Sequence, residues 1–184
     1  MSRLLTVFLS LFLLNCSDIY VNDIDVDYTT TALVPGFTPI AGLDIPTPSL
    51  TELGFDEFTQ FDINASQAFK DKVGSVSKVT FINLQTFELE TTDPELSIDF
   101  LDKVSFYISI ANGPERLLAH LDSVPLNSNR VLLDVDRSLD LTPYIKSENI
   151  TIRTEVIGTI PNVDTELTAN LIFLVDTTHN AFYN

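Results

Sequence analysis

Regular alternation of apolar and polar residues is the main signal in this chain. Ile24, Val26 and Tyr28 alternate with aspartates, and similar alternation recurs in later segments. A period of two places the apolar side chains on one face of a β-strand. The pattern predicts strands over residues 17–32, 58–63, 77–90, 102–110, 115–122, 130–136, 149–159 and 166–176.

Helical signals are short and few. Asn64, followed three residues later by Gln67, is typical of a helix N-cap and predicts a helix that runs to Lys72. Residues 141–147 predict a single helical turn with Pro143 near its start. Residues 33–54 hold four of the nine prolines and three of the six glycines, so we expect an extended connection there.

Short strands separated by turn residues favour an antiparallel architecture over βαβ units. We therefore expect one all-β domain over residues 19–176, an antiparallel two-sheet β-sandwich with Greek-key, immunoglobulin-like connections and one or two short helical turns. Residues 177–184 are expected to form a flexible C-terminal tail. The expected core consists of Phe81, Val104, Phe106, Ile108, Val131, Leu133, Ile152, Leu171 and Phe173.

The N-terminus has the layout of an export signal. Arg3 precedes an apolar run from Leu4 to Leu14, which ends at Asn15-Cys16. A permanent transmembrane helix needs about 20 apolar residues, whereas the apolar core of a signal peptide has about 7–15. A buried N-terminal helix or strand is the alternative, but the run has no amphipathic period. We expect residues 1–15 to be a signal peptide that is removed.

Leu13-Leu14-Asn15-Cys16 resembles the signal of bacterial lipoproteins, although Asn15 stands where Gly, Ala or Ser is usual. The resemblance implies that Cys16 is acylated and becomes the first mature residue, with residues 16–18 as a short tether. An ordinary secretory signal cut near the same place is the alternative. Cys16 is the only cysteine of the chain. An exported chain with a single cysteine cannot form an internal disulfide, which favours a lipid acceptor.

Three further stretches resemble small uncharacterised lipoproteins of flavobacteria and related Bacteroidetes. They are FELETTDPELSIDFLDKVSFYISI, LDLTPYIKSENITIRTEV and LIFLVD. This resemblance implies a cell-envelope protein that its lipid attaches to the outer membrane, and it implies no activity. Ser17-Asp18 partly resembles the signal that sends such proteins to the outer face of that membrane.

The charge of the chain restricts its partners. Twenty-six acidic residues against ten basic ones give a formal net charge of −16. Nucleic-acid binding depends on clustered Lys and Arg, and here these residues are scattered. The composition excludes nucleic acid as a partner, and it excludes electrostatic docking onto anionic lipid. Attachment to a membrane must then come from the lipid on Cys16.

Catalytic signatures are lacking in the sequence. No nucleophile motif, phosphate-binding glycine loop or histidine metal motif is present. We expect His120 on a strand and His179 in the tail. We interpret Asn64 as a helix cap and Asn149 as the start of a strand. We expect no catalytic residue and no cofactor, and a non-catalytic binding or structural module that contacts an envelope protein or a glycan. The alternative is an envelope hydrolase whose site is assembled from acidic residues distant in sequence.

Two acidic clusters raise the question of a weak calcium site. Alternate strand residues point the same way, so each cluster would form a row of carboxylates, and calcium binds six to eight oxygens. The alternative is that both rows are solvated faces, with Arg137 neutralising one cluster and Asp140 capping the turn that follows it. The clusters are Asp23, Asp25 and Asp27, and Asp134, Asp136 and Asp140.

Overall fold

The computed structural model describes residues 19–38, 58, 62–111, 113–147 and 149–180. Eight strands make up most of this part of the chain, and the helical segments are short. The strands are β1 (Ile19–Val34), β2 (Val79–Thr91), β3 (Leu101–Ile110), β4 (Arg116–Leu121), β5 (Arg130–Leu132), β6 (Asp134–Val135), β7 (Ile150–Gly158) and β8 (Thr165–Asn180). The helical segments are η3 (Ile63–Ala65), α1 (Gln67–Lys72), η4 (Val76–Lys78) and α2 (Thr142–Ile145).

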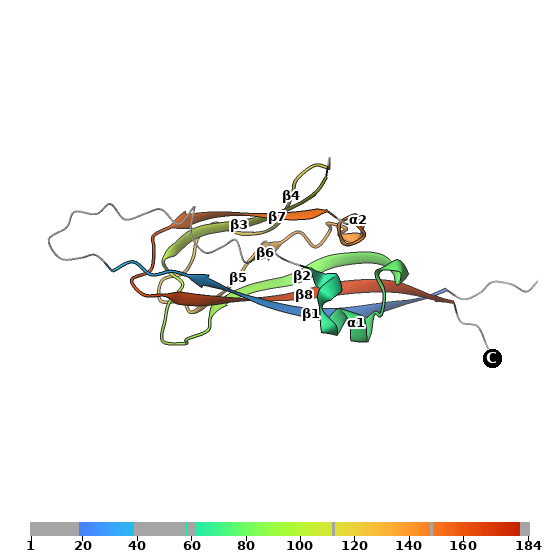
Figure 1. Cartoon of the computed structure of the whole chain (residues 1–184), viewed down its shortest axis with the longest axis horizontal. Helices are drawn as coiled ribbons and strands as arrows, with labels where there is room; N and C mark the ends of the chain where they lie inside the picture. Colours follow the sequence, from blue (N-terminus) through green and yellow to red (C-terminus); the bar gives the residue numbers. More distant parts are fainter. Residues whose placement is uncertain (1–18, 39–57, 59–61, 112, 148, 181–184) are drawn as a thin grey trace, which may run out of the picture.

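The strands form two four-stranded sheets that face each other (Figure 1). Sheet A has the order β1-β8-β2-β5, and sheet B has the order β6-β4-β3-β7. Every neighbouring pair is antiparallel. The predicted all-β two-sheet sandwich is confirmed.

The connections cross between the sheets. The chain leaves β2 in sheet A, forms β3 and β4 in sheet B, and returns as β5 beside β2. As in a Greek key, the fourth of these strands lies beside the first, but β2 and β3 belong to different sheets and do not pair. β1 lies beside β8, so the first strand pairs with the last, whereas strand A of an immunoglobulin domain lies beside strand B.

Alternation predicted the core well, with one exception. Eight of the nine expected core residues are buried, from Val104 on β3 to Phe173 on β8. The ninth, Phe81, is half-buried, so its assignment to the core is wrong. The pairing of β2 with β8 shifts register between Val79 and Phe81. This bulge turns Phe81 to the outer face and gives the core position to Ile82, which is fully buried.

The strand predicted over residues 58–63 is wrong where the structure describes it. The Asp62 carboxylate accepts hydrogen bonds from the main-chain N–H groups of Asn64 and Ala65, at 2.9 and 3.3 Å. These bonds start η3 and turn the chain away from an extended path. Residues 59–61 lie outside the described residues. Phe58 is buried, and its ring meets that of Phe106 edge to face at 6.2 Å.

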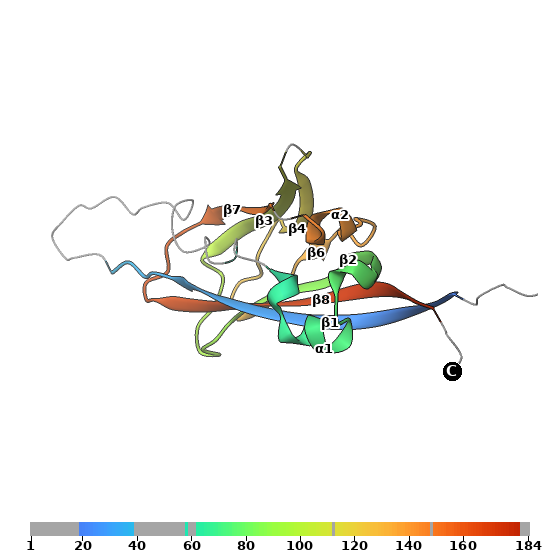
Figure 2. The same cartoon turned by 45° about the vertical axis from the view of Figure 1, so that its right-hand side comes forward.

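The predicted helix is confirmed as α1, but its N-cap is Ser66 and not Asn64. The Asn64 side-chain amide donates instead to the carbonyl of Ile145 in α2, at 3.0 Å. Figure 2 shows α1 alongside β1. Lys72 at its end donates to the main-chain carbonyl of Asp25 at 2.7 Å, so this helix covers part of the free edge of sheet A.

Two predicted elements differ in extent. The strand over 130–136 is divided at Leu133, whose N–H donates to the Phe87 carbonyl at 2.9 Å, and its halves belong to different sheets. A flexible tail from residue 177 is wrong as far as Asn180, because β8 continues to that residue and pairs it with Ile19. The turn over 141–147 is confirmed as α2, with proline at its start.

The first and last strands meet at one end of the sandwich, and three connecting links lie at the other end (Figure 1). β1 begins and β8 ends at one end. The links from β2 to β3, from β4 to β5 and from β7 to β8 lie at the opposite end. Within the described residues, no helix is long and apolar enough to cross a membrane.

Candidate functional site

The candidate site is a cleft at the loop end of the sandwich, which is the end where the links from β2 to β3, from β4 to β5 and from β7 to β8 lie. It lies between the link from β2 to β3 and the link from β7 to β8, and it has a volume of about 510 Å³. Pockets that hold small ligands commonly measure about 300–1,000 Å³. Loops carried on a rigid sheet scaffold are also the usual place for binding residues. Size and position therefore both suit ligand binding.

Main-chain and side-chain bonds hold the two links in place. Thr159 N–H donates to the Phe100 carbonyl at 2.8 Å, which joins one link directly to the other. The Asn127 N–H donates to Asp99 Oδ2 at 3.1 Å, and Ser97 Oγ donates to the Ser128 carbonyl at 3.0 Å. The link from β4 to β5 is thus bonded to the link from β2 to β3, which lines the cleft.

The end of β1 presses against the same site. Gly36 N–H donates to Asp164 Oδ1 and Phe37 N–H donates to the Pro161 carbonyl, each at 2.8 Å. A Cβ atom on Gly36 would overlap the main-chain carbon of Val163. A glycine is required at this position because only a residue without a side chain allows so close an approach.

The lining of the cleft is half polar and half apolar. Its apolar lining residues are Leu96, Phe100, Ile160, Pro161 and Val163. Its polar lining residues are Ser97, Asp99, Thr159, Asn162 and Thr165. These residues include one carboxylate and no lysine, arginine or histidine, so the cleft offers no positive charge to an anionic ligand.

A second hollow of about 390 Å³ lies beside β7. Its lining comes from Lys103 on β3 and from residues 154–157. Ile157 is 58% exposed there. Single exposed apolar residues of this kind are normal on protein surfaces and do not by themselves indicate a site.

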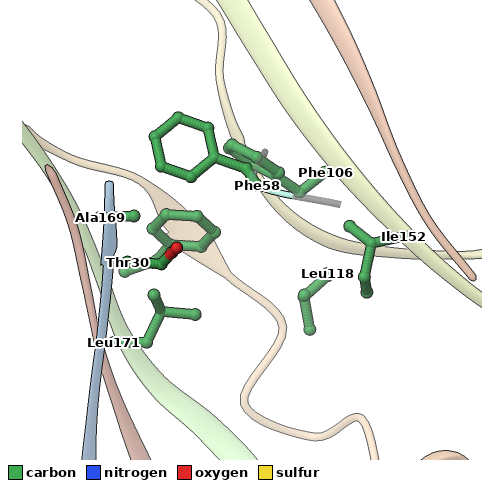
Figure 3. Close-up of a pocket in the computed structure, with 8 residues that line it drawn as sticks. Thr30, Phe58, Phe106, Leu118, Ile152, Ala169 and Leu171 are labelled. Atoms are coloured by element: carbon green, nitrogen blue, oxygen red, sulfur yellow. The ribbon is translucent and has the colours of Figure 1, made fainter. Parts of the chain in front are cut away.

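The third cavity is a packing defect and not a ligand site. Figure 3 shows Phe58 and Phe106, Ala169 and Leu171, and Leu118 and Ile152 around it, with the Thr30 hydroxyl as its polar group. The space measures about 20 Å³, which is about the size of one water molecule. It lies between the two sheets, so it is part of the core.

The predicted row of Asp23, Asp25 and Asp27 exists on the outer face of β1, where all three are exposed. The Lys72 ammonium pairs with Asp27 Oδ2 at 3.0 Å. Asp23 lies opposite Asp176 of β8. Burial of Asp176, and secondly its proximity to Asp23, raise the pKa of the Asp176 carboxyl above its usual value. The structure therefore brings together a carboxyl pair that the sequence pattern did not indicate.

The second cluster is dispersed along its loop. Asp136 Oδ1 accepts from the N–H and hydroxyl of Ser138, at 3.0 and 2.6 Å, and these bonds lower the pKa of Asp136. Asp140 Oδ1 accepts from Thr142 N–H at 2.8 Å, so it supports the start of α2. In the described part of the chain, no group of three or more His, Cys, Asp or Glu residues is placed to hold a metal ion.

His120 lies on β4 between Ser105 of β3 and Asp134 of β6. Its Nε2 atom is 3.8 Å from Asp122 Oδ2. A serine, a histidine and a carboxylate are the components of a hydrolase triad. The sequence did not predict this grouping, because the register of strand pairing brings the residues together. Ser105 is only 2% exposed, however, so a substrate could not reach its hydroxyl.

The outer face of sheet B carries a fixed ionic cluster. The Arg153 guanidinium pairs with both carboxylate oxygens of Glu115, at 2.8 and 2.6 Å. It also pairs with Glu155 and lies 4.2 Å above the Tyr107 ring. Hydrogen bonds from Arg153 lower the pKa values of both glutamates. Every charge of this cluster has a partner within the chain, so the cluster acts as a brace across β3, β7 and the turn before β4.

The expected lipidation site, Cys16, and the tether to residue 18 lie outside the described residues. The side chain of His179 is also outside them, although its backbone pairs with Tyr20 on β1. That pairing places His179 on a strand, and not in a tail as the sequence suggested.

Comparison with known proteins adds little to this geometry. No protein-family model and no curated protein sequence matches the chain. The crystal structure of a 60-mer BFDV capsid protein is similar over 90% of this chain and 97% of that one. The identity is 8% and the TM-score is 0.34. A likeness this weak carries no functional argument.

Proposed function

We propose that this chain is a lipid-anchored cell-envelope protein that acts as a non-catalytic binding module, with acylated Cys16 as its first mature residue. The apolar run up to Leu14 and the position of the only cysteine support the anchor. Attachment to the outer membrane is part of the same proposal and rests on the resemblance of three later stretches to lipoproteins of flavobacteria and related Bacteroidetes.

The observation that carries the proposal is the opposite placement of the chain start and the cleft. β1 begins at Ile19, three residues after Cys16, and has 16 residues. A strand rises about 3.3 Å per residue, so β1 spans about 50 Å. Its last residues lead to Gly36, which contacts the link from β7 to β8. A short tether at one end of β1 would hold the cleft away from the membrane at the other end.

Binding is favoured over hydrolysis by the placement of the reactive groups. Ser105 is buried beside His120. The carboxyl pair of Asp23 and Asp176 lies on an outer sheet face at the end opposite the cleft. The cleft itself has Asp99 as its one carboxylate, whereas glycoside hydrolysis requires two.

Mass spectrometry of the protein extracted from its own membrane tests the anchor. We expect residues 1–15 to be absent and Cys16 to carry acyl groups. Cys16→Ser should remain unacylated and leave the membrane fraction, while Ser17→Ala, next to it, should be acylated and stay in the membrane fraction. A parent protein with a free N-terminal cysteine, recovered in the soluble fraction, would contradict the proposal.

A further inference from the structure

We infer that the cleft of the loop end is a binding site for a neutral saccharide, held through its hydroxyl groups. This inference rests on the proposed binding function and names its ligand class. Three polar side chains in the cleft, those of Asp99, Thr159 and Asn162, are exposed. Apolar side chains, such as those of Leu96 and Val163, line the same cleft.

The hydrogen-bonding capacity of these three groups suits sugar hydroxyls. Asp99 uses Oδ2 for the Asn127 N–H, and its other oxygen remains as an acceptor. Among the described residues, no hydrogen-bond partner is found for the side chains of Thr159 and Asn162. An amide and a hydroxyl both donate and accept. A sugar hydroxyl also does both, so a carboxylate, an amide and a hydroxyl in one cleft can hold several of them.

The apolar residues of the cleft fit the same ligand. Sugars present C–H groups as well as hydroxyls, and burial of apolar surface stabilises binding. Phe100 and Ile160 are buried at the base, so they form a rigid support and not an adaptable lid. Mixed lining of this kind combines apolar contact with a few placed polar groups, as small-ligand sites generally do.

Anionic ligands fit the cleft poorly. Its lining has no cationic side chain, and the chain carries a net charge of −16. A phosphate or an acidic sugar would meet Asp99 without a compensating charge. The part of the ligand that enters the cleft is therefore uncharged.

Peptide ligands also fit less well. Known peptide modes use a free strand edge, a continuous apolar groove or an aromatic-lined groove. The cleft lies between two links, Leu96–Phe100 and Thr159–Val163, with Thr165 at the first position of β8. It therefore offers a peptide no strand edge. Phe100 is the one aromatic residue of its lining, and it is buried, so the cleft is not an aromatic-lined groove.

Titration calorimetry of the full chain in detergent tests the inference. The probes are maltotriose, cellotriose, mannotriose and chitotriose, with trigalacturonic acid and a neutral pentapeptide as competing classes. We expect saturable binding of at least one neutral trisaccharide. Asn162→Ala and Asp99→Asn should each weaken it by about tenfold, because each removes hydrogen bonds to sugar hydroxyls. Asn in place of Asp99 keeps an acceptor for Asn127.

Asn149→Ala is the matched control, because Asn149 is an exposed asparagine outside the cleft, and it should bind as the parent does. Unchanged binding in Asn162→Ala, no binding of any neutral probe at millimolar concentration, or preference for the acidic probe or the peptide would each overturn the inference. Mass spectrometry of the same preparation separates the two proposals. Acylated protein that binds no sugar refutes the saccharide site alone, and sugar binding by unacylated protein refutes the anchor alone.

Discussion

At the scale of single residues, two positions depend on contacts between distant parts of the chain. Asp176 is one, because burial and Asp23 raise its pKa. Gly36 is the other, because the main chain of Val163 occupies the space that a side chain would need. In both cases the residue that sets these properties is more than 100 positions away in the sequence.

Asp176→Asn should raise the melting temperature at pH 7. A carboxyl whose pKa is higher in the folded state than the unfolded value of about 3.9 costs stability when it ionises. That cost is absent below the unfolded pKa and grows as the pH rises through the folded pKa. The advantage of the variant should therefore shrink as the pH falls toward 4, which thermal unfolding between pH 4 and pH 8 would show.

Asp25→Asn is the control for this substitution, because Asp25 is exposed on the same face and loses the same charge. It should show no comparable pH-dependent gain. A lower melting temperature for Asp176→Asn than for the parent at pH 7 would mean that the carboxylate is stabilising.

Gly36→Ala should destabilise the loop end. The new methyl group would overlap the main chain of Val163, so one of the two segments must move, at a cost of about 1–3 kcal/mol. Each kcal/mol lowers the melting temperature of a domain of this size by about 2–4 °C. Thr38→Ala, which removes one hydrogen bond to the Asn162 carbonyl, should cost less. Equal melting temperatures for Gly36→Ala and the parent would show that the close approach is not required.

At the scale of elements, side-chain contacts join neighbouring strands within sheet B. Arg153 joins β7 to Glu115 before β4 and to the Tyr107 ring on β3. Lys103 on β3 pairs with Asp122 after β4 at 2.7 Å. The hydrogen bond from Lys103 lowers the pKa of Asp122. Arg153 lowers the pKa values of Glu115 and Glu155 in the same way. These pairs stabilise the fold above the unfolded pKa of the acids, and that contribution is lost as the pH falls through their lowered folded values.

Arg153→Lys should lower the urea midpoint although it keeps the charge. An ammonium group cannot make the two-pronged contact with Glu115 or stack flat on Tyr107. Lys103→Arg is the reciprocal control and should leave the midpoint nearly unchanged, since an arginine can still pair with Asp122. An unchanged midpoint in Arg153→Lys, at constant slope, would show that the brace adds no stability.

Calcium should leave the unfolding of the protein unchanged. Asp27, Asp136 and Asp140 already bind Lys72, Ser138 and Thr142. Thermal unfolding in millimolar calcium and in chelator should therefore give superimposable curves. A midpoint that rises with calcium concentration would reveal a bound ion, and Asp134→Asn with Asp23→Asn would then locate it.

At the scale of the whole molecule, the length of β1 separates Ile19, next to the proposed tether, from the cleft at the other end. On a membrane, the acylated protein should stand with its loop end outward. A dye attached through Leu126→Cys, in the link from β4 to β5 where Leu126 is 82% exposed, should transfer little energy to acceptors in the lipid headgroups. The same dye at Asp25→Cys, nearer the start of β1, should transfer much more. Equal transfer from both positions would mean that the molecule lies flat.

Alternation along the chain was sufficient to predict most of the strands and most of the core, although not over residues 58–63. Val104, Phe106 and Ile108 are buried as expected, because the face a strand residue occupies follows from a local period of two. The proposed export and acylation would also depend on a local pattern, that around Cys16, since an export signal is recognised along the chain before folding. For the same reason, the short turn at Pro143 was predicted from its own residues.

Tertiary structure decided the features that depend on pairing between distant segments. The bulge that removed Phe81 from the core exists only because β2 pairs with β8, and the segment over 130–136 divides at Leu133 because its halves join different sheets. The Asp23–Asp176 pair comes from the first and last strands. The cleft likewise needs residues 96–100 and 159–165 to meet, and neither segment has a composition that marks it. Local periods determine which face a residue occupies, whereas strand order determines which faces, links and charges meet.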